Sequence, residues 1–197
     1  RASSARPASA RFPLAWGAAG SVDWPPTAAQ GRELIALAPA IVGGFARLRS
    51  GDEPVDPAGS EGLGVAGRLL HAISGDVPEA SRERALDAYF VCCAEHGLNA
   101  STFTARVVTS THSDLASAVC GAVGALKGRL HGGAPSGVRD QLTQIGDVDH
   151  AERWIREALA RGERLMGFGH RIYRTTDPRA EALRSVAEGL AALQCGA

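Results

Sequence analysis

The sequence is poor in several features, and each shortage excludes a class of protein. It contains no run of about 18 apolar residues, so no segment is predicted to span a membrane. Its 21 basic and 21 acidic side chains leave no net charge, which argues against a general nucleic-acid-binding protein, because such proteins neutralise phosphates with excess positive charge. Its four cysteines include no CxxC pair, and this indicates reduced thiols in the cytoplasm rather than a disulfide framework.

Methionine and lysine are almost absent. Met166 is the only methionine, so the chain does not begin with an initiator, and it ends on the small residues Cys195, Gly196 and Ala197. From these two features we expect the 197 residues to be a piece of a longer protein. Lys127 is the only lysine, and the remaining basic residues are arginines, whose planar side chains bind carboxylates and phosphates.

The apolar residues that are present recur at helical spacing along almost the whole chain. Asp114 and Asp177 are predicted helix N-caps, and Pro178 suits the first turn of the last helix. No stretch alternates as a strand would, so the predicted fold class is all-α, with loops over residues 50–60 and 162–176. Helices are predicted over residues 31–49, with a kink at Pro39, and over 61–74, 78–96, 100–111, 113–127, 134–145, 149–161 and from 177 onward.

His131 is a candidate catalytic residue because it precedes Gly132 and Gly133 in a break between two helices. An imidazole beside a helix N-terminus is biased towards its neutral form, since the positive end of the helix dipole disfavours the imidazolium. A neutral imidazole can donate a hydrogen bond to a developing enolate oxygen. The alternative is a histidine that caps a helix or lies in the core, and the residues alone favour this alternative.

His170 stands among arginines, in the segment Met166-Gly-Phe-Gly-His-Arg-Ile-Tyr-Arg-Thr-Thr-Asp-Pro-Arg179. Arg179 is predicted to lie in the first turn of a helix, where the dipole disfavours a cation. This costly placement indicates that the guanidinium and the helix N-terminus bind an anion together, although a solvated arginine face accounts for the residues equally well. A Gly-Phe-Gly run with no strand before it does not predict a dinucleotide-binding fold.

Polar residues, among them Asn99 and Ser101, gather directly after His96. They can orient a histidine or a substrate, or they can cap a helix. The three histidines His96, His131 and His170 lack the spacing of metal ligands, so no metal site is expected. A serine hydrolase is not expected either, because the sequence has no GxSxG motif.

Three segments together, in this order and spacing, resemble the citrate synthase family. They are His96-Gly-Leu-Asn-Ala-Ser-Thr-Phe-Thr-Ala-Arg106, Gly128-Arg-Leu-His-Gly-Gly-Ala134 and the segment from Met166 to Arg179. The resemblance runs from about Gly31 to the chain end and does not clearly include residues 1–26. It implies a largely helical homodimer in which a small domain closes over a large one.

The resemblance also implies roles for individual residues. His131 would stabilise the enolate of acetyl-CoA, and His170 would polarise the ketone of oxaloacetate. His96 and Arg179 would bind the carboxylates of oxaloacetate. The remaining implied roles are Arg174 as a contact for a CoA phosphate, the backbone through Leu165, Met166, Gly167 and Gly169 as the loop that accepts adenine, and Asn99 and Ser101 as residues of the substrate site that support the histidines.

The resemblance places the family's catalytic base, an aspartate, well beyond the segment that contains His170. This chain ends about 27 residues after that histidine, so we expect the base to lie outside it and the chain alone to be inactive. The expected domains are an irregular segment over residues 1–28, part of the large helical domain over 29–133 and the start of the small domain over 134–197.

The implied function is condensation of acetyl-CoA with oxaloacetate to citrate and CoA in the cytoplasm, with acetyl-CoA as co-substrate and no permanently bound cofactor. A 2-methylcitrate synthase that uses propionyl-CoA is an alternative, because one methylene is discriminated by only about 1–3 kcal/mol. There are two further alternatives for the function. One is a non-catalytic remnant that pairs with full-length subunits, and the other is the citryl-CoA lyase module of citrate-cleaving enzymes. The expected partners are these small molecules and, at full length, a second copy of the chain, with no nucleic acid and no membrane.

Overall fold

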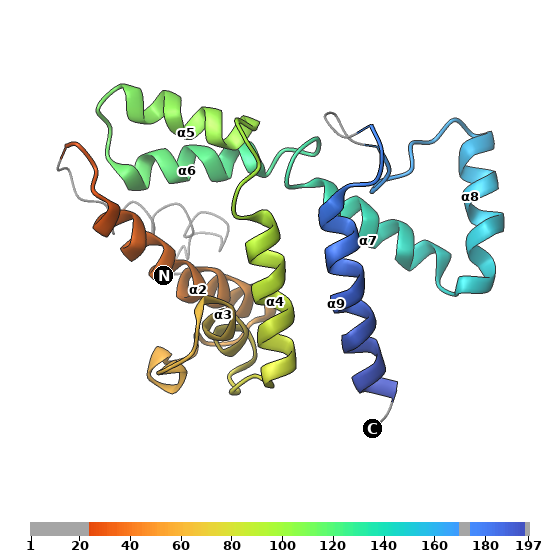
Figure 1. Cartoon of the computed structure of the whole chain (residues 1–197), viewed down its shortest axis with the longest axis horizontal. Coiled ribbons are helices and arrows are strands. Elements are labelled where there is room, and N and C mark those ends of the chain that lie inside the picture. Colours follow the sequence, from red (N-terminus) through yellow and green to blue (C-terminus); the bar gives the residue numbers. More distant parts are fainter. Residues whose placement is uncertain (1–23, 170–173, 196–197) are drawn as a thin grey trace, which may run out of the picture.

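The computed structural model describes residues 24–169 and 174–195, and every regular element among them is a helix, which confirms the predicted all-α fold class. Most of the segment expected to be irregular, residues 1–28, lies outside the described residues. The elements, shown in Figure 1, are α2 (Ala28–Ser50), η1 (Pro57–Ser60), α3 (Val65–Ser74), α4 (Ala80–Cys93), α5 (Ala100–Ser110), α6 (Leu115–Leu126), α7 (Ala134–Ile145), η2 (Val148–His150), α8 (Ala151–Ala160) and α9 (Pro178–Cys195).

The first helix begins earlier than its apolar periodicity indicates, because Thr27 and Gln30 form a capping box. The Thr27 hydroxyl accepts a hydrogen bond from the Gln30 backbone N–H at 3.2 Å, and Gln30 Oε1 accepts one from the Thr27 N–H at 2.7 Å. These reciprocal bonds satisfy backbone donors that the first helical turn leaves without partners. Pro39, which was expected to kink the helix, lies inside α2.

Later boundaries differ too: α3 begins at Val65 rather than at residue 61, α4 ends at Cys93 rather than at His96, and two further differences lie beside prolines. α4 begins at Ala80 rather than at Pro78, because Glu79 has an extended backbone with a ψ of 140°. The predicted loop over residues 50–60 contains the short helix η1, whose first backbone donors are satisfied by Asp56: its carboxylate accepts from the Ala58 N–H at 3.0 Å. In both places the backbone around a proline decides where the helix begins, and the spacing of apolar residues does not predict that position.

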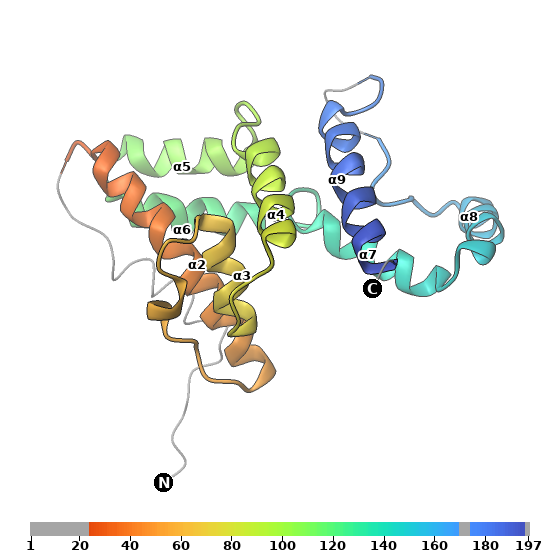
Figure 2. The ribbon, with the colours of Figure 1, turned by 60° about the horizontal axis from the view of Figure 1, so that its bottom comes forward.

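The helices form two packed pairs that share a small core. α2 packs against α3 and α5 packs against α6, and both Figure 1 and Figure 2 show each pair side by side. α2 also contacts α6, where Leu34 and Ala116 are buried. The partly buried residues around them are Ala38, Ile41, Leu115, Val119 and Cys120. Because alanine and glycine line these contacts, the helix backbones approach one another closely.

α4 connects this part of the molecule to the C-terminal helix. It packs against α3 on one side and against α9 on the other, and the two views show α4 and α9 next to each other (Figures 1 and 2). The turn that contains His96 follows directly after α4. The first turn of α9 and the end of α4, far apart in the sequence, therefore belong to one packed unit.

The contact between α2 and α3 depends on the absence of a side chain at Gly43. A Cβ atom at this position would lie 2.8 Å from the carbonyl carbon and 2.9 Å from the carbonyl oxygen of Ala72, and also against the Ala72 Cβ. Backbone atoms cannot move aside as a flexible side chain can. The neighbouring Gly44 is different, since a Cβ there would meet only Pro54 at an ordinary 3.7 Å.

Replacing Gly43 with alanine is therefore expected to separate α2 from α3 and to lower the free energy of unfolding by about 1–3 kcal/mol. Gly44→Ala is the matched control, and it should leave stability unchanged or raise it by roughly 0.5–1 kcal/mol, because alanine favours a helix interior over glycine. Urea denaturation of the two variants and the parent chain measures this. Equal stability of the two variants would contradict the close-contact explanation.

Asp114 begins α6 and confirms the predicted N-cap. Its Oδ1 accepts from the Ser117 backbone N–H at 2.8 Å, and its Oδ2 accepts from the Ser117 hydroxyl at 2.6 Å. The Ser117 hydroxyl, followed by the Ser117 backbone donor, lowers the pKa of the Asp114 carboxyl from its ordinary value. Since the folded state lowers this pKa, the ionised carboxylate stabilises the fold above its ordinary pKa, and the contribution is lost as the pH falls through the lowered pKa.

Asp114→Ala is expected to lower the free energy of unfolding by about 1 kcal/mol at neutral pH, because it removes the cap. The difference from the parent chain should shrink as the solution is acidified, since the protonated carboxyl no longer makes both bonds well. Denaturant titrations at a series of pH values check this. Ser117→Ala keeps the backbone bond and should show a smaller loss at neutral pH, whereas a difference that does not change with pH would rule out the ionised cap.

Candidate active site

His131 lies in a tight turn between α6 and α7. Its backbone N–H and that of Gly133 both donate to the carbonyl oxygen of Gly128, at 2.9 and 3.1 Å. A Cβ at Gly133 would lie 2.9 Å from that same oxygen, and one at Gly132 would lie 2.6 Å from the Leu126 side chain. The two glycines after His131 therefore allow the turn that carries its imidazole towards α5.

The imidazole of His131 meets the N-terminus of α5, thirty residues earlier in the chain. Its Nε2 lies 2.9 Å from the Ser101 hydroxyl oxygen and 3.3 Å from the Ser101 backbone nitrogen, whose N–H points at it. The Ser101 hydroxyl is also 2.8 Å from Asn99 Oδ1, and this oxygen accepts from the Thr102 N–H at 3.0 Å. Asn99 is the N-cap of α5, so the cap of one helix and the turn before another hold the same imidazole.

This arrangement ties the tautomer of His131 to the orientation of one hydroxyl group. The Ser101 hydroxyl has one hydrogen and two acceptors within reach, Asn99 Oδ1 and His131 Nε2. When the hydrogen points at Nε2, together with the Ser101 N–H, the imidazole carries its hydrogen on Nδ1. When it points at Asn99, Nε2 carries the hydrogen and donates to the hydroxyl. The structure brings together Asn99, Ser101 and His131.

The structure changes the interpretation of His131 and describes the surroundings of His96. The helix terminus that contacts the His131 imidazole is that of α5, in addition to the start of α7 that follows it in the sequence. His96 lies half-buried in the turn between α4 and α5, where Gly97 has a φ of 62° and donates its N–H to Glu95 Oε1 at 2.7 Å. His170 falls in residues 170–173, outside the described part of the chain, so its predicted role is not addressed by the geometry.

The anion inferred at the start of α9 is already present in the protein, which corrects one argument from the sequence. Asp177 accepts from the backbone N–H of Arg179 at 2.9 Å and pairs with its guanidinium, Nε to Oδ1 at 3.0 Å and Nη2 to Oδ2 at 2.6 Å. The carboxylate offsets the cost of a cation in the first helical turn. The position of Arg179 therefore does not by itself require an external anion, and its substrate role remains a prediction from the resemblance.

α4 and α9 bring Arg179 close to the tyrosine of α4. The pKa of the Tyr89 phenol is raised by the neighbouring charge of Cys93, by burial and by a hydrogen bond with Cys93, while the Arg179 guanidinium lowers it. Tyr89 and Cys93 are one helical turn apart on α4, just before His96. Arg179 thus acts electrostatically on Tyr89 in the C-terminal half of α4.

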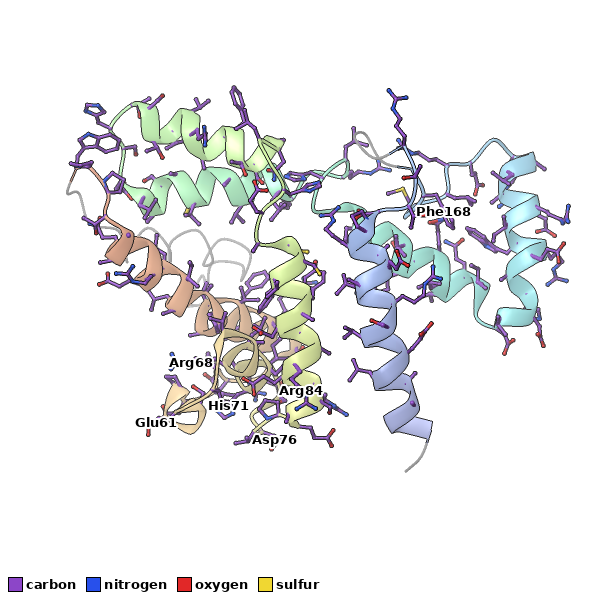
Figure 3. All side chains as sticks on the ribbon, viewed as in Figure 1. Glu61, Arg68, His71, Asp76, Arg84 and Phe168 are labelled. Atoms are coloured by element: carbon purple, nitrogen blue, oxygen red, sulfur yellow. The ribbon has the colours of Figure 1, made fainter. Side chains whose placement is uncertain are left out.

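The loop over residues 165–169 is attached to α7. The Met166 backbone N–H donates to Gln141 Oε1 at 2.7 Å, across 25 residues of sequence. Gly167 and Gly169 have φ values of 85° and 80°, in the left-handed region that favours glycine. Between them Phe168 is 70% exposed, and Figure 3 shows it on the part of the molecule that contains α7 and α9. Arg174, the predicted phosphate contact, is also exposed.

A separate cavity of about 350 Å³ lies on the other side of the molecule, between α2 and α3. His71 is buried there, with Nδ1 3.2 Å from the Asp76 carbonyl oxygen and Nε2 3.4 Å from that of Asp56. Figure 3 shows His71 with Arg68 and Glu61 near it, far from Phe168. His71 therefore joins two loops to α3, and this cavity contains none of the predicted site residues.

Gln141 is the site residue that the sequence did not indicate. Its partner is 25 residues away, and no local pattern marks a glutamine in a helix as a contact for a distant loop.

Within residues 24–169 and 174–195, no three or more His, Cys, Asp or Glu side chains are grouped so as to hold a metal ion. In the same described part, no helix is long and apolar enough to cross a membrane.

Comparison with known proteins identifies the family. The model of the citrate synthase C-terminal domain matches residues 13–196, so the match begins earlier than the motifs indicated. A 2-methylcitrate synthase of Mycobacterium tuberculosis (strain ATCC 25618 / H37Rv) is 46% identical over 168 residues, 85% of this chain and 42% of that protein. Citrate synthase 2 of Bacillus subtilis (strain 168) is 46% identical over 157 residues, 80% of this chain and 42% of that protein.

Solved structures agree with these matches. A ternary complex of citrate synthase from Thermoplasma acidophilum with carboxymethyl coenzyme A and oxaloacetate has a TM-score of 0.78 at 30% identity, over 96% of this chain and 51% of that chain. Citrate synthase from Thermotoga maritima has a TM-score of 0.68 at 36% identity, over 79% of this chain and 42% of that chain. The chain thus spans about half or less of the length of these relatives. With a family model that covers nearly all of its residues, this chain belongs to the citrate synthase family.

Proposed function

We propose that the protein to which these residues belong is an acyltransferase that condenses acetyl-CoA with oxaloacetate to give citrate and CoA. The observation that carries the proposal is the contact of His131 Nε2 with the Ser101 backbone N–H and hydroxyl at the N-terminus of α5. A weakly acidic methyl group is deprotonated only where a donor stabilises the enolate oxygen that forms. His131 held by Ser101, with hydrogen on Nδ1, supplies such a donor.

The other roles follow the resemblance. His96 and Arg179 bind the oxaloacetate carboxylates. His170 polarises the ketone. The loop that includes Leu165, Met166, Gly167 and Gly169 accepts the adenine of CoA, Arg174 contacts a CoA phosphate, and no cofactor is permanently bound. Turnover is expected only where the aspartate that the resemblance implies is also present.

A 2-methylcitrate synthase is the second candidate, because a relative of that name is as similar to this chain as a citrate synthase is. The relative of that name and the relative named citrate synthase 2 are both 46% identical to this chain. Propionyl-CoA differs from acetyl-CoA by one methylene, which a pocket discriminates by about 1–3 kcal/mol. Parallel titrations with the two thioesters therefore distinguish the candidates.

We also propose that the protein is a cytoplasmic homodimer at full length, with α5 and α6 at the interface. Phe103 and Val107 of α5 are 56% and 48% exposed, which is high for large apolar side chains. On α6, a Cβ at Gly124 would meet nothing within 4 Å, so a second helix could approach closely there. The same face serves the alternative of a non-catalytic chain that pairs with full-length subunits. The free thiols of Cys92, Cys93 and Cys120 suit a reducing compartment.

Arg179→Gln tests the substrate site. If the guanidinium binds a carboxylate of oxaloacetate, calorimetric titration should show affinity for oxaloacetate reduced by about tenfold or more, because a hydrogen bond to a charged group is lost. Affinity for CoA should not change. Arg184→Gln, at an exposed position of the same helix, is the control and should bind both ligands like the parent chain. Unchanged oxaloacetate affinity in Arg179→Gln would refute the assignment, and a parent chain that binds neither ligand would refute the proposed function.

The tautomer of His131 tests its proposed role as a donor. In a chain labelled with ¹⁵N-histidine, the imidazole of His131 should show its hydrogen on Nδ1, because the Ser101 backbone N–H points at Nε2 and the Ser101 hydroxyl, when it turns from Asn99 to Nε2, adds a second donor. Ser101→Ala should move the population towards hydrogen on Nε2, whereas Ser101→Thr keeps a hydroxyl and should not. His131→Gln identifies the resonances. Hydrogen on Nε2 in the parent chain would contradict donation from Nδ1.

A further inference from the structure

Gln141 makes a long-range hydrogen bond to a loop that contains two glycines in left-handed conformations. Its Oε1 accepts from the Met166 N–H at 2.7 Å, and both residues are half-buried. The loop that follows contains Gly167 and Gly169 in left-handed conformations. Glycine loses more conformational freedom on ordering than any other residue, so such a loop needs contacts from outside to keep one shape.

The surface of α7 is shaped to receive this loop. Gly137 and Gln141 lie one helical turn apart and so share a face of α7. A Cβ at Gly137 would lie 3.0 Å from Met166 Cγ, so the loop side chain occupies the space that a larger residue would fill. A Cβ at Gly167 would lie 3.2 Å from Val138 Cγ2, which shows that the loop backbone also rests against α7.

We infer that Gln141 is a positioning residue for recognition of the CoA adenine. It holds the backbone at Met166. This bond also restricts Gly167, Phe168 and Gly169, so that the loop has its binding conformation before the adenine arrives. A loop that is ordered before binding does not have to be ordered at the cost of affinity. This inference rests on the proposed function for its ligand, while the anchoring itself rests on the contacts between α7 and residues 166–167.

The sequence offers a specific probe of this anchor, because Met166 is the only methionine. Labelling with ¹⁵N-methionine reports the Met166 amide without overlap from other internal amides. Gln141→Leu removes the acceptor and should accelerate hydrogen exchange of this amide by about threefold to tenfold, since one hydrogen bond is lost. Gln141→Glu keeps a carboxyl oxygen at the same position and should restore slow exchange. Gln144→Leu makes the same change at an exposed position of α7 and should have no effect.

The affinity for CoA, measured by calorimetry on the same chains, completes the test. Gln141→Leu should weaken CoA binding by about threefold to tenfold, and it should leave oxaloacetate binding unchanged. If the parent chain binds CoA and Gln141→Leu binds it equally well, the positioning role is wrong while the proposed function stands. If the parent chain does not bind CoA, the proposed function is wrong, and the exchange rates still decide whether Gln141 holds the loop. Unchanged exchange in Gln141→Leu overturns the anchor in either case.

Discussion

The candidate site depends on the side-chain oxygen of Asn99. This oxygen accepts from the Thr102 N–H at the start of α5 and lies 2.8 Å from the Ser101 hydroxyl, which is also within reach of His131 Nε2. A helix start is stable only when its first backbone donors have partners, so this oxygen has a structural reason to stay in place. Because Ser101 contacts both Asn99 and His131, the position of the His131 imidazole is fixed as well. Local capping and the chemistry of the site therefore use the same atom.

Small residues make the surrounding architecture possible. The close approach of α2 and α3 requires Gly43, and the turn that presents His131 requires the glycines after it. In the core shared by α2 and α6, the buried Leu34 packs with the fully buried Ala116. Such contacts allow little rearrangement, because backbone meets backbone without flexible side chains between them. The positions of the site residues are consequently defined by helix packing more than by their own neighbours in the sequence.

The chain has no net charge, but a pair of opposite charges lies at the start of α9. Asp177 caps this helix and pairs with Arg179, so one carboxylate satisfies the backbone and orients the guanidinium. Because Asp177 supplies a negative charge in the first turn of α9, the position of Arg179 does not by itself indicate an external anion. The resemblance assigns Arg179 to the substrate on other grounds, and the contact of α9 with α4 places its charge near Tyr89 in the C-terminal half of α4.

Much of the secondary structure could be predicted, since helical periodicity and caps are local properties. Asp114 as the cap of α6 follows directly from the residue type before an apolar run. The start of α2 was predicted late because the capping box of Thr27 and Gln30 precedes the apolar stripe. The start of α4 was predicted early because Pro78 suits a first turn, whereas the extended backbone of Glu79 delays the helix to Ala80.

The sequence by itself determined the helices, the candidate histidines and, through its three motifs, the resemblance to the family. Tertiary structure decided which side chains meet: Ser101 with His131 across thirty residues, and Met166 with Gln141 across 25. The physical reason is that a hydrogen bond between distant residues depends on how whole helices pack and loops close, and no spacing along the chain reports this. The residue type and helical position of Gln141 do not indicate a distant partner, and the contact with Met166 becomes visible only in the folded structure.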